Sequence, residues 1–245
     1  YEGSYIGGLR DGNGTSFANG QAKHQGEWKK DWPAGHGTHY FKNGQIRYQG
    51  AWKRRRDGHG TSYFSNGQIE YQGEWKLGQE DGNGTKRFCG GQIKYTGGWK
   101  KGVPDGSGTA YGLHTGKKAY EGSYIGGLRD GNGTSFANGQ AKHQGEWKKD
   151  WPAGHGTHYF KNGQIRYQGA WKRRRDGHGT SYFSNGQIEY QGEWKLGQED
   201  GNGTKRFCGG QIKYTGGWKK GVPDGSGTAY GLHTGKKAYE GSYIG

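Results

Sequence analysis

An aromatic residue two positions after a glycine recurs along the chain at intervals of 23 to 25 residues. The glycine of an expected turn lies eight positions before the aromatic residue. These glycines are Gly20, Gly44, Gly67, Gly91 and Gly116, and the aromatic residues that follow them are Trp28, Trp52, Trp75, Trp99 and Tyr124. The segments between these units vary in length by a residue or two. A segment of fixed length between variable ones indicates a strand held in register between loops.

The fixed segment alternates in character. In QIEYQGEW, Ile69, Tyr71, Gly73 and Trp75 share one parity and polar residues the other, which is typical of a half-buried strand. A second strand is expected over DGHGTSYF, residues 57–64. An Asn-Gly pair separates the two strands at Asn19-Gly20, Asn43-Gly44 and Asn66-Gly67. Asn-Gly favours a type I′ turn, which needs positive φ at both central residues, so each repeat is predicted to be a β-hairpin.

A lone hairpin is marginally stable, so the hairpins must pair with one another. The chain is poor in aliphatic residues but has 10 Trp, 18 Tyr and 56 Gly. We expect rings to lie on the bare backbone of the Gly-x-Gly sequences. The predicted fold is all-β: an elongated single-sheet β-solenoid or ribbon of stacked antiparallel β-hairpins. The residues expected to build it are Trp28, Trp52, Trp75, Trp99, Trp147, Trp171, Trp194, Trp218, Gly58 and Gly60.

A longer period of 119 residues is superimposed on the short one, because residues 120–245 repeat residues 1–126 letter for letter. The predicted organisation is a first copy of five hairpins over 1–119, an identical second copy over 120–238, and the start of a further repeat over 239–245. Tandem duplication, a designed array and averaging over identical units would all give this identity. Neither end has the atypical repeat that usually caps a solenoid, so a longer chain or an end-to-end polymer is expected.

The pattern Tyr-x-Gly-x-(Trp/Tyr), about six residues and then Gly-x-Gly resembles the MORN (membrane occupation and recognition nexus) repeat. It begins at Tyr1, His24, Tyr48, Tyr71 and Tyr95, and again at Tyr120, His143, Tyr167, Tyr190 and Tyr214. His24 and His143 depart from the pattern, and the added Gly-Gln-Ile phrase resembles bacterial variants. The resemblance implies an elongated antiparallel sheet that serves as a scaffold, an oligomerisation platform or a membrane-associated tether. No residue-level ligand contacts carry over from it.

Basic residues follow the aromatic markers directly, and the formal net charge is +15. Stacking should align them as a stripe spaced ~10 Å along one edge. The stripe comprises Lys29, Lys30, Lys53, Arg54, Arg55, Arg56, Lys76, Lys100 and Lys101, with Lys172, Arg173, Arg174 and Arg175 in the second copy. It either binds a polyanion or protects an exposed edge from aggregation, and nearby aspartates (Asp11, Asp57, Asp81 and Asp105) would neutralise part of it. Arg54–Arg56 and Arg173–Arg175 are the best candidates for binding.

Other chemistry finds little support. His36 and His59 are one repeat apart, too far to share a metal ion, so no metal or other cofactor is expected. The Gly-x-Gly pairs lack the following helix and lysine of a phosphate loop, and no catalytic residues are expected. Cys89 and Cys208 occupy equivalent positions and should be free thiols or pair between molecules. Asn13, Asn83, Asn132 and Asn202 fit the glycosylation sequon if the protein is secreted.

We therefore expect a non-enzymatic structural protein that forms a β-solenoid rod or filament. Its partner would be itself, end-to-end or side-by-side, and its location extracellular or at the cell surface. The alternative is a MORN-type scaffold that docks an anionic membrane, on the cytoplasmic face, or an acidic polymer such as a polysaccharide, through the basic stripe. Specific nucleic-acid recognition is not expected.

Overall fold

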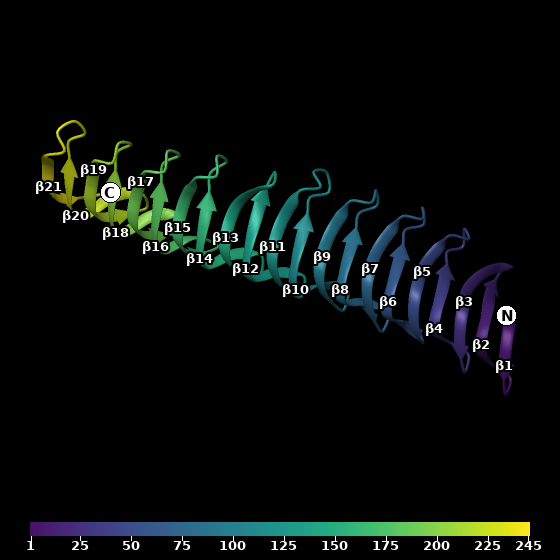
Figure 1. The fold of residues 1–245 in the computed structure, drawn as a ribbon. Coiled ribbons are helices and arrows are strands. Elements are labelled where there is room, and N and C mark those ends of the chain that lie inside the picture. The colour runs from purple at the N-terminus through teal and green to yellow at the C-terminus, as the bar shows by residue number, and fades with distance from the viewer. The chain divides into compact units, whose positions relative to one another are not determined.

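The computed structural model describes all residues from 1 to 245 as strands, turns and loops, without any helix (Figure 1). Accordingly, no helix is long and apolar enough to cross a bilayer. The chain divides into two compact units, Tyr1–Leu128 and Arg129–Gly245. Each unit is described by itself.

The strands of the first unit are β1 (Glu2–Ile6), β2 (Leu9–Ala18), β3 (Gln21–Lys29), β4 (Trp32–Tyr40), β5 (Ile46–Lys53), β6 (Arg55–Tyr63), β7 (Ile69–Lys76), β8 (Gln79–Arg87), β9 (Ile93–Lys100), β10 (Val103–Tyr111) and β11 (Lys118–Ile125). Those of the second unit are β12 (Leu128–Ala137), β13 (Gln140–Lys148), β14 (Trp151–Tyr159), β15 (Ile165–Lys172), β16 (Arg174–Tyr182), β17 (Ile188–Lys195), β18 (Gln198–Arg206), β19 (Ile212–Lys219), β20 (Val222–Tyr230) and β21 (Lys237–Tyr243).

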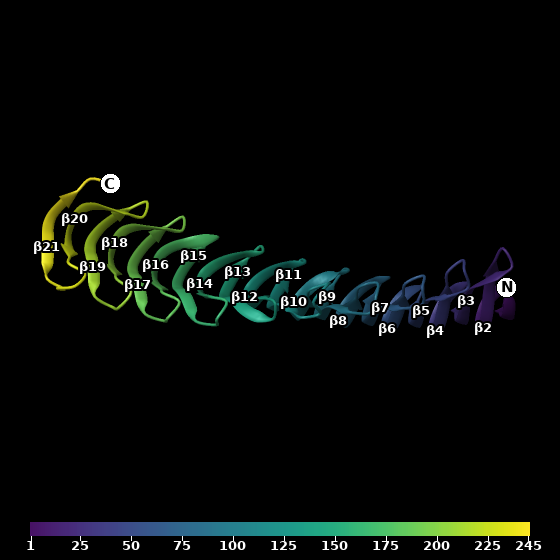
Figure 2. The same cartoon turned by 90° about the horizontal axis from the view of Figure 1, so that it is seen from above.

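Within each unit, every strand pairs antiparallel with its neighbours in chain order. This holds from β1 to β11 in the first unit and from β12 to β21 in the second. The strands curve along their length (Figure 2). The predicted all-β fold of stacked antiparallel hairpins is confirmed.

The connections lie along two opposite edges of each unit (Figure 1). Tight turns follow the odd-numbered strands, and we name this side the turn edge. Longer connections follow most even-numbered strands on the opposite side, the loop edge.

A row of glycines crosses the middle of the sheet. Gly37 pairs with Gly50, Gly50 with Gly60, and Gly60 with Gly73, and the row continues through the remaining strands of the unit. A Cβ added to Gly60 would overlap the phenol ring of Tyr48. The second glycine of each Gly-x-Gly therefore forms the expected floor, because only bare backbone leaves room for the ring.

The first glycine of the pair has a different role. Gly58 takes a φ of 99° where Ala51 faces a bulge in β6. Side chains other than glycine rarely adopt such a φ, so Gly58 is required by the backbone conformation. The sequence prediction that both glycines serve as packing floors is correct for Gly60 and wrong for Gly58.

Edge-to-face aromatic contacts link successive hairpins above the glycine row. The ring centroid of Tyr48 lies 5.1 Å from that of Trp52 and 5.3 Å from that of Trp75, with interplanar angles of 88° and 86°. Each such pair contributes about 0.5–1.5 kcal/mol beyond the area it buries. The Trp75 indole N–H also donates to the carbonyl oxygen of Gly60, at 3.1 Å. Tyr48 is fully buried and Trp75 is 5% exposed, so the rings replace an aliphatic core.

The same arrangement recurs in both units and involves the predicted tryptophans. Those that are buried are Trp28, Trp75, Trp99, Trp147, Trp194 and Trp218. Trp52 and Trp171 are half-buried, and their indoles donate to Gly37 and Gly156.

The turn chemistry differs from the prediction at most Asn-Gly pairs. Asn19 and Gly20 have φ of 52° and 76°, as a type I′ turn requires, because Ala18 pairs with Gln21 and leaves two residues between. At the next loop Tyr40 pairs with Ile46, which leaves five residues. There only Gly44 has positive φ, so the type I′ prediction is wrong for Asn43-Gly44, and likewise for Asn66-Gly67.

The tightest turns with two positive φ values instead lie on the turn edge. Lys30 and Asp31 have φ of 46° and 68°, and Leu77 and Gly78 have 51° and 90°. Asn-Gly pairs are rare in these turns. The turn type on this edge follows instead from the number of residues left between the paired strands.

The glycine floor generates a stability prediction. Gly84→Ala should lower the free energy of unfolding by about 1–3 kcal/mol, because the new methyl group overlaps the ring of Tyr71. The control is Gly116→Asn, where φ is 61° and nothing lies within 4 Å, so the loss should stay below about 0.5 kcal/mol. Urea denaturation followed by tryptophan fluorescence measures both. Equal losses for the two variants would contradict the proposed role of the floor.

Candidate functional site

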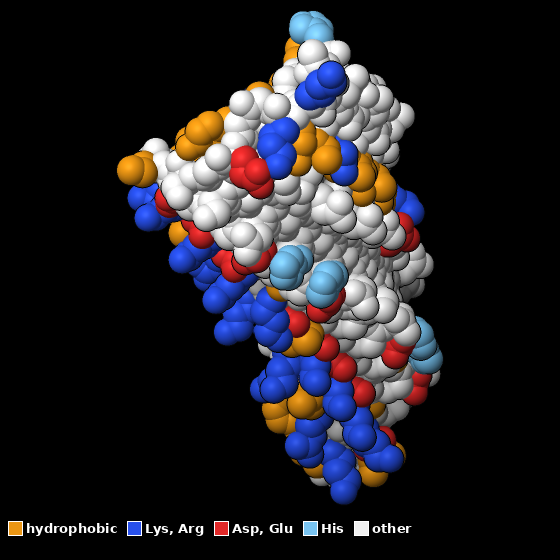
Figure 3. All heavy atoms as spheres, turned by 90° about the vertical axis from the view of Figure 1, so that its left-hand side faces the viewer, with side chains coloured by type: hydrophobic (Ala, Val, Ile, Leu, Met, Phe, Trp, Pro, Cys, Tyr) orange, Lys and Arg blue, Asp and Glu red, His pale blue; other side chains and the backbone are white.

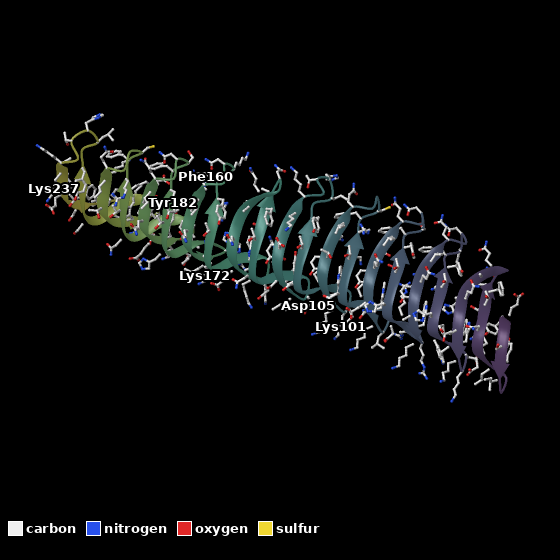
Figure 4. The ribbon with its side chains drawn as sticks, in the orientation of Figure 1. Lys101, Asp105, Phe160, Lys172, Tyr182 and Lys237 are labelled. Carbon is white, nitrogen blue, oxygen red and sulfur yellow. The ribbon has the colours of Figure 1, made fainter.

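Exposed basic side chains gather on the turn edge of each unit. In the first unit they are Lys29, Lys30, Lys53, Arg54, Arg55, Lys76, Lys100 and Lys101. In the second they are Lys148, Lys149, Lys172, Arg173, Arg174, Lys195, Lys219 and Lys220. Figure 4 labels Lys101 and Lys172 on this edge, and Figure 3 shows the Lys and Arg side chains gathered together with apolar ones. Consecutive turns are two strands apart, which spaces them by ~10 Å.

Arg56 and Arg175 do not belong to this stripe. The Arg56 guanidinium carbon lies 4.8 Å from the ring centroid of Tyr48 and 4.9 Å from that of Trp75. Burial against these rings lowers the pKa of Arg56, although the group stays charged. Arg56 pairs with Trp52 across the hairpin, so its side chain packs on the aromatic face. The sequence alone did not identify this placement, because it follows from the one-residue turn that sets the pairing of the two strands.

The aspartates that were predicted to neutralise part of the basic stripe have a structural role. Asp57 accepts a hydrogen bond from the backbone N–H of Leu77 at 3.2 Å, and Asp81 accepts one from Lys101 at 3.2 Å. Asp11 and Asp105 hold the turns at Lys30 and Gly126 in the same way. Each turn is thus fixed to the preceding hairpin.

Charge neutralisation along the turn edge is partial. Lys148 pairs with Asp130 at 3.1 Å, and Lys219 with Asp224 at 3.5 Å. Both lysine side chains are 68% exposed, so these ion pairs contribute little to stability. Most of the basic side chains on the edge remain available to a partner.

Exposed apolar side chains share the turn edge with the basic ones. Leu77 is 63% exposed and Trp32 is 52% exposed. The other members of this set are Ile6, Leu9, Val103, Ile125, Leu128, Trp151, Leu196 and Val222. These residues were not predicted from the sequence, although each lies in or beside a two-residue turn such as KLGQ or KGVP. The turn edge is therefore amphipathic.

The remaining predicted sites lie elsewhere. His36 and His59 are exposed on separate strands, and the structure contains no cluster of three or more potential metal ligands. Cys89 and Cys208 are exposed free thiols on the loop edge. The four sequon asparagines lie exposed within strands β2, β8, β12 and β18, and their glycosylation stays a prediction.

A buried histidine interrupts the row of tyrosines, next to a half-buried histidine on the neighbouring strand. His24 is 4% exposed and pairs across the sheet with His39. Its ring lies against Trp28 and Trp52 at 5.0 and 4.8 Å, and neither of its ring nitrogens has a hydrogen-bond partner. Burial, with further lowering by nearby cations, brings the pKa of both histidines to about 4.

The histidine pair generates a pH prediction. The folded-state pKa lies below the unfolded value of 6.5. The free energy of unfolding therefore keeps its full value above pH 6.5 and decreases as pH falls towards 4. The second unit repeats the pair at His143 and His158, with pKa values also near 4. Tyr is the residue found at this position in the other repeats. Replacing His24 and His143 by Tyr should reduce the loss of stability at low pH.

Urea midpoints at pH 7 and pH 4.5 measure the effect. The control exchanges the exposed His59 and His178 for Asn and should keep the wild-type pH dependence. A wild-type protein that is equally stable at both pH values would refute the prediction.

The family model of the MORN repeat matches the chain ten times, over residues 1–22, 24–46, 48–69, 71–93, 95–112, 120–141, 143–165, 167–188, 190–212 and 214–231. A comparison with curated proteins finds no match. Tandem repeats of this kind indicate a repeat scaffold or binding module. On the evidence of its ten matched repeats, the chain belongs to the MORN repeat family.

Proposed function

We propose that the protein is a non-catalytic scaffold that docks on an anionic membrane surface through its turn edge. The observation that carries the proposal is the interleaving of exposed Lys and Arg side chains with exposed apolar ones on the same edge. Self-association into rods or filaments and an extracellular location stay predictions.

Electrostatic attraction supplies the first part of the affinity. Each Lys or Arg near an anionic leaflet contributes about 1 kcal/mol, and the contribution falls off within a Debye length. The turns present these charges in a row, and the Asp57-type hydrogen bonds fix the backbone beneath them. A pre-organised row loses little conformational freedom on binding.

The apolar side chains favour a membrane over a soluble polyanion. Leu77 and Trp32 can enter the boundary between headgroups and acyl chains, where burial of apolar area is favourable. An acidic polysaccharide offers no comparable apolar phase.

The buried polar groups support a non-catalytic role. The hydroxyl group of Tyr48 donates to the carbonyl oxygen of Ala51 at 3.0 Å, and that of Tyr71 donates to Glu74 at 3.0 Å. Burial raises the pKa of Tyr48 to about 12. These hydroxyls are engaged within the sheet and are poor bases or nucleophiles at neutral pH.

Vesicle co-sedimentation tests the proposal. The full chain should bind vesicles with phosphatidylserine far more strongly than neutral phosphatidylcholine vesicles, and the binding should weaken with salt. Leu77→Asn with Leu196→Asn removes two exposed apolar groups and keeps the turn, because Asn tolerates the φ of 51° and 52° found there. This variant should bind anionic vesicles about tenfold more weakly.

The matched control is Leu113→Asn with Leu232→Asn, which changes two leucines, each 43% exposed, on the loop edge. It should bind like the wild type. Absence of binding to anionic vesicles would refute the proposed function. A loss of binding in the control equal to that in the Leu77 variant would refute the assignment to the turn edge.

A further inference from the structure

A hollow lies on the turn edge between the turns that follow β3 and β5. Its volume is about 440 Å³, and its wall includes Lys29, Lys30, Trp32, Trp52, Lys53 and Arg54. The second unit contains the same hollow, with a volume of about 390 Å³, around Trp151 and Arg173. The site therefore recurs once per unit.

The hollow is lined by four cationic side chains and no carboxylate. The nearest acids in the sequence are engaged elsewhere: Asp31 accepts from the Arg10 guanidinium at 2.9 Å, and Glu27 accepts from the backbone N–H of His36 at 2.9 Å. In the second unit one of the four, Lys148, pairs with Asp130. The four cationic side chains give the wall of the hollow a net positive charge.

A single substitution within the repeat explains the missing carboxylate. Ala34 occupies the position at which the other repeats carry Asp11, Asp57, Asp81 and Asp105. The following turn is therefore held only through its backbone, by the bond from Arg54 N–H to the carbonyl oxygen of Pro33 at 2.9 Å.

The turn at Arg54 is also one residue shorter than its neighbours. Lys53 pairs with Arg55, so Arg54 alone forms the turn and takes a φ of 65°. Its guanidinium carbon lies 5.7 Å from the ring centroid of Trp32, which is 52% exposed. An Arg beside an exposed indole forms a wall that is both cationic and apolar.

We propose that this hollow is a subsite for the phosphomonoester headgroup of an anionic lipid. The inference rests on the proposed membrane docking and specifies which lipid headgroup the turn edge prefers. Arginine and lysine together suit a terminal phosphate, which carries more charge and more free oxygens than the phosphodiester of other lipids. Trp32 has the amphipathic character of residues that lie at headgroup depth.

The test compares vesicles that contain phosphatidic acid with vesicles that contain phosphatidylglycerol, adjusted to the same measured zeta potential. The full wild-type chain should bind the phosphatidic acid vesicles about tenfold more tightly, as two or more charge-assisted hydrogen bonds per site allow. Inorganic pyrophosphate in solution should compete and reduce this preference, since it carries the same terminal phosphate group.

Two matched variants test whether the preference for phosphatidic acid vesicles depends on the hollow. Arg54→Asn with Arg173→Asn should abolish it. Lys101→Asn with Lys220→Asn removes the same charge from turns with φ of 50° and should weaken binding to both vesicle types equally, leaving the ratio intact. Restoring the carboxylate with Ala34→Asp and Ala153→Asp should also reduce the ratio, and circular dichroism verifies that each variant is folded.

The outcomes separate the two proposals. The subsite is overturned, while membrane docking stands, if the wild type binds both anionic vesicle types equally. The same conclusion follows if the Lys101 variant loses the preference for phosphatidic acid vesicles as fully as the Arg54 variant does. Binding to neither type above neutral vesicles overturns the proposed function and the subsite together.

Discussion

The contact of an aromatic ring with bare backbone is the interaction on which the rest of this structure depends. Tyr48 can cover Gly60 only because no Cβ stands between them, and the Trp75 indole N–H donates to the carbonyl oxygen of the same glycine. Aliphatic side chains would fill a two-layer core, but a single sheet has no second layer. Rings packed edge to face on the sheet bury large areas without one.

That constraint also determines where binding surface is left over. Because the rings occupy the middle of the sheet, the exposed apolar and basic side chains of the turn edge lie at the ends of the strands. Most of the tight turns are held to the preceding hairpin by Asp57 and its equivalents, whereas the turn at Arg54 is held through its backbone alone. Variation is thus concentrated at Lys53–Arg55 and Trp32, where it alters charge and shape without disturbing the rings.

The central features were predictable from sequence because they follow a strict period. The constant spacing from Gly67 to Trp75 identified the strand, and its alternation identified Tyr71 and Trp75 as buried. Features that depend on the partner strand were not predictable in this way. The side chosen by Arg56 follows from its pairing with Trp52, and the loop at Asn43 follows from the pairing of Tyr40 with Ile46. The exposed apolar residues at the turns were missed because periodicity describes strands and not the residues between them.

The pairing of each strand only with its chain neighbours has a mechanical consequence. Nearest-neighbour contacts make each unit behave like a one-dimensional stack, in which one layer can detach while the next remains folded. Tension applied to the terminal strand of a unit would load its inter-strand hydrogen bonds a few at a time. Such a unit would yield in small increments, each releasing the contour length of one repeat of 23 to 25 residues, or roughly 75–90 Å. It would act as an extensible element that absorbs work gradually and does not fail in a single event.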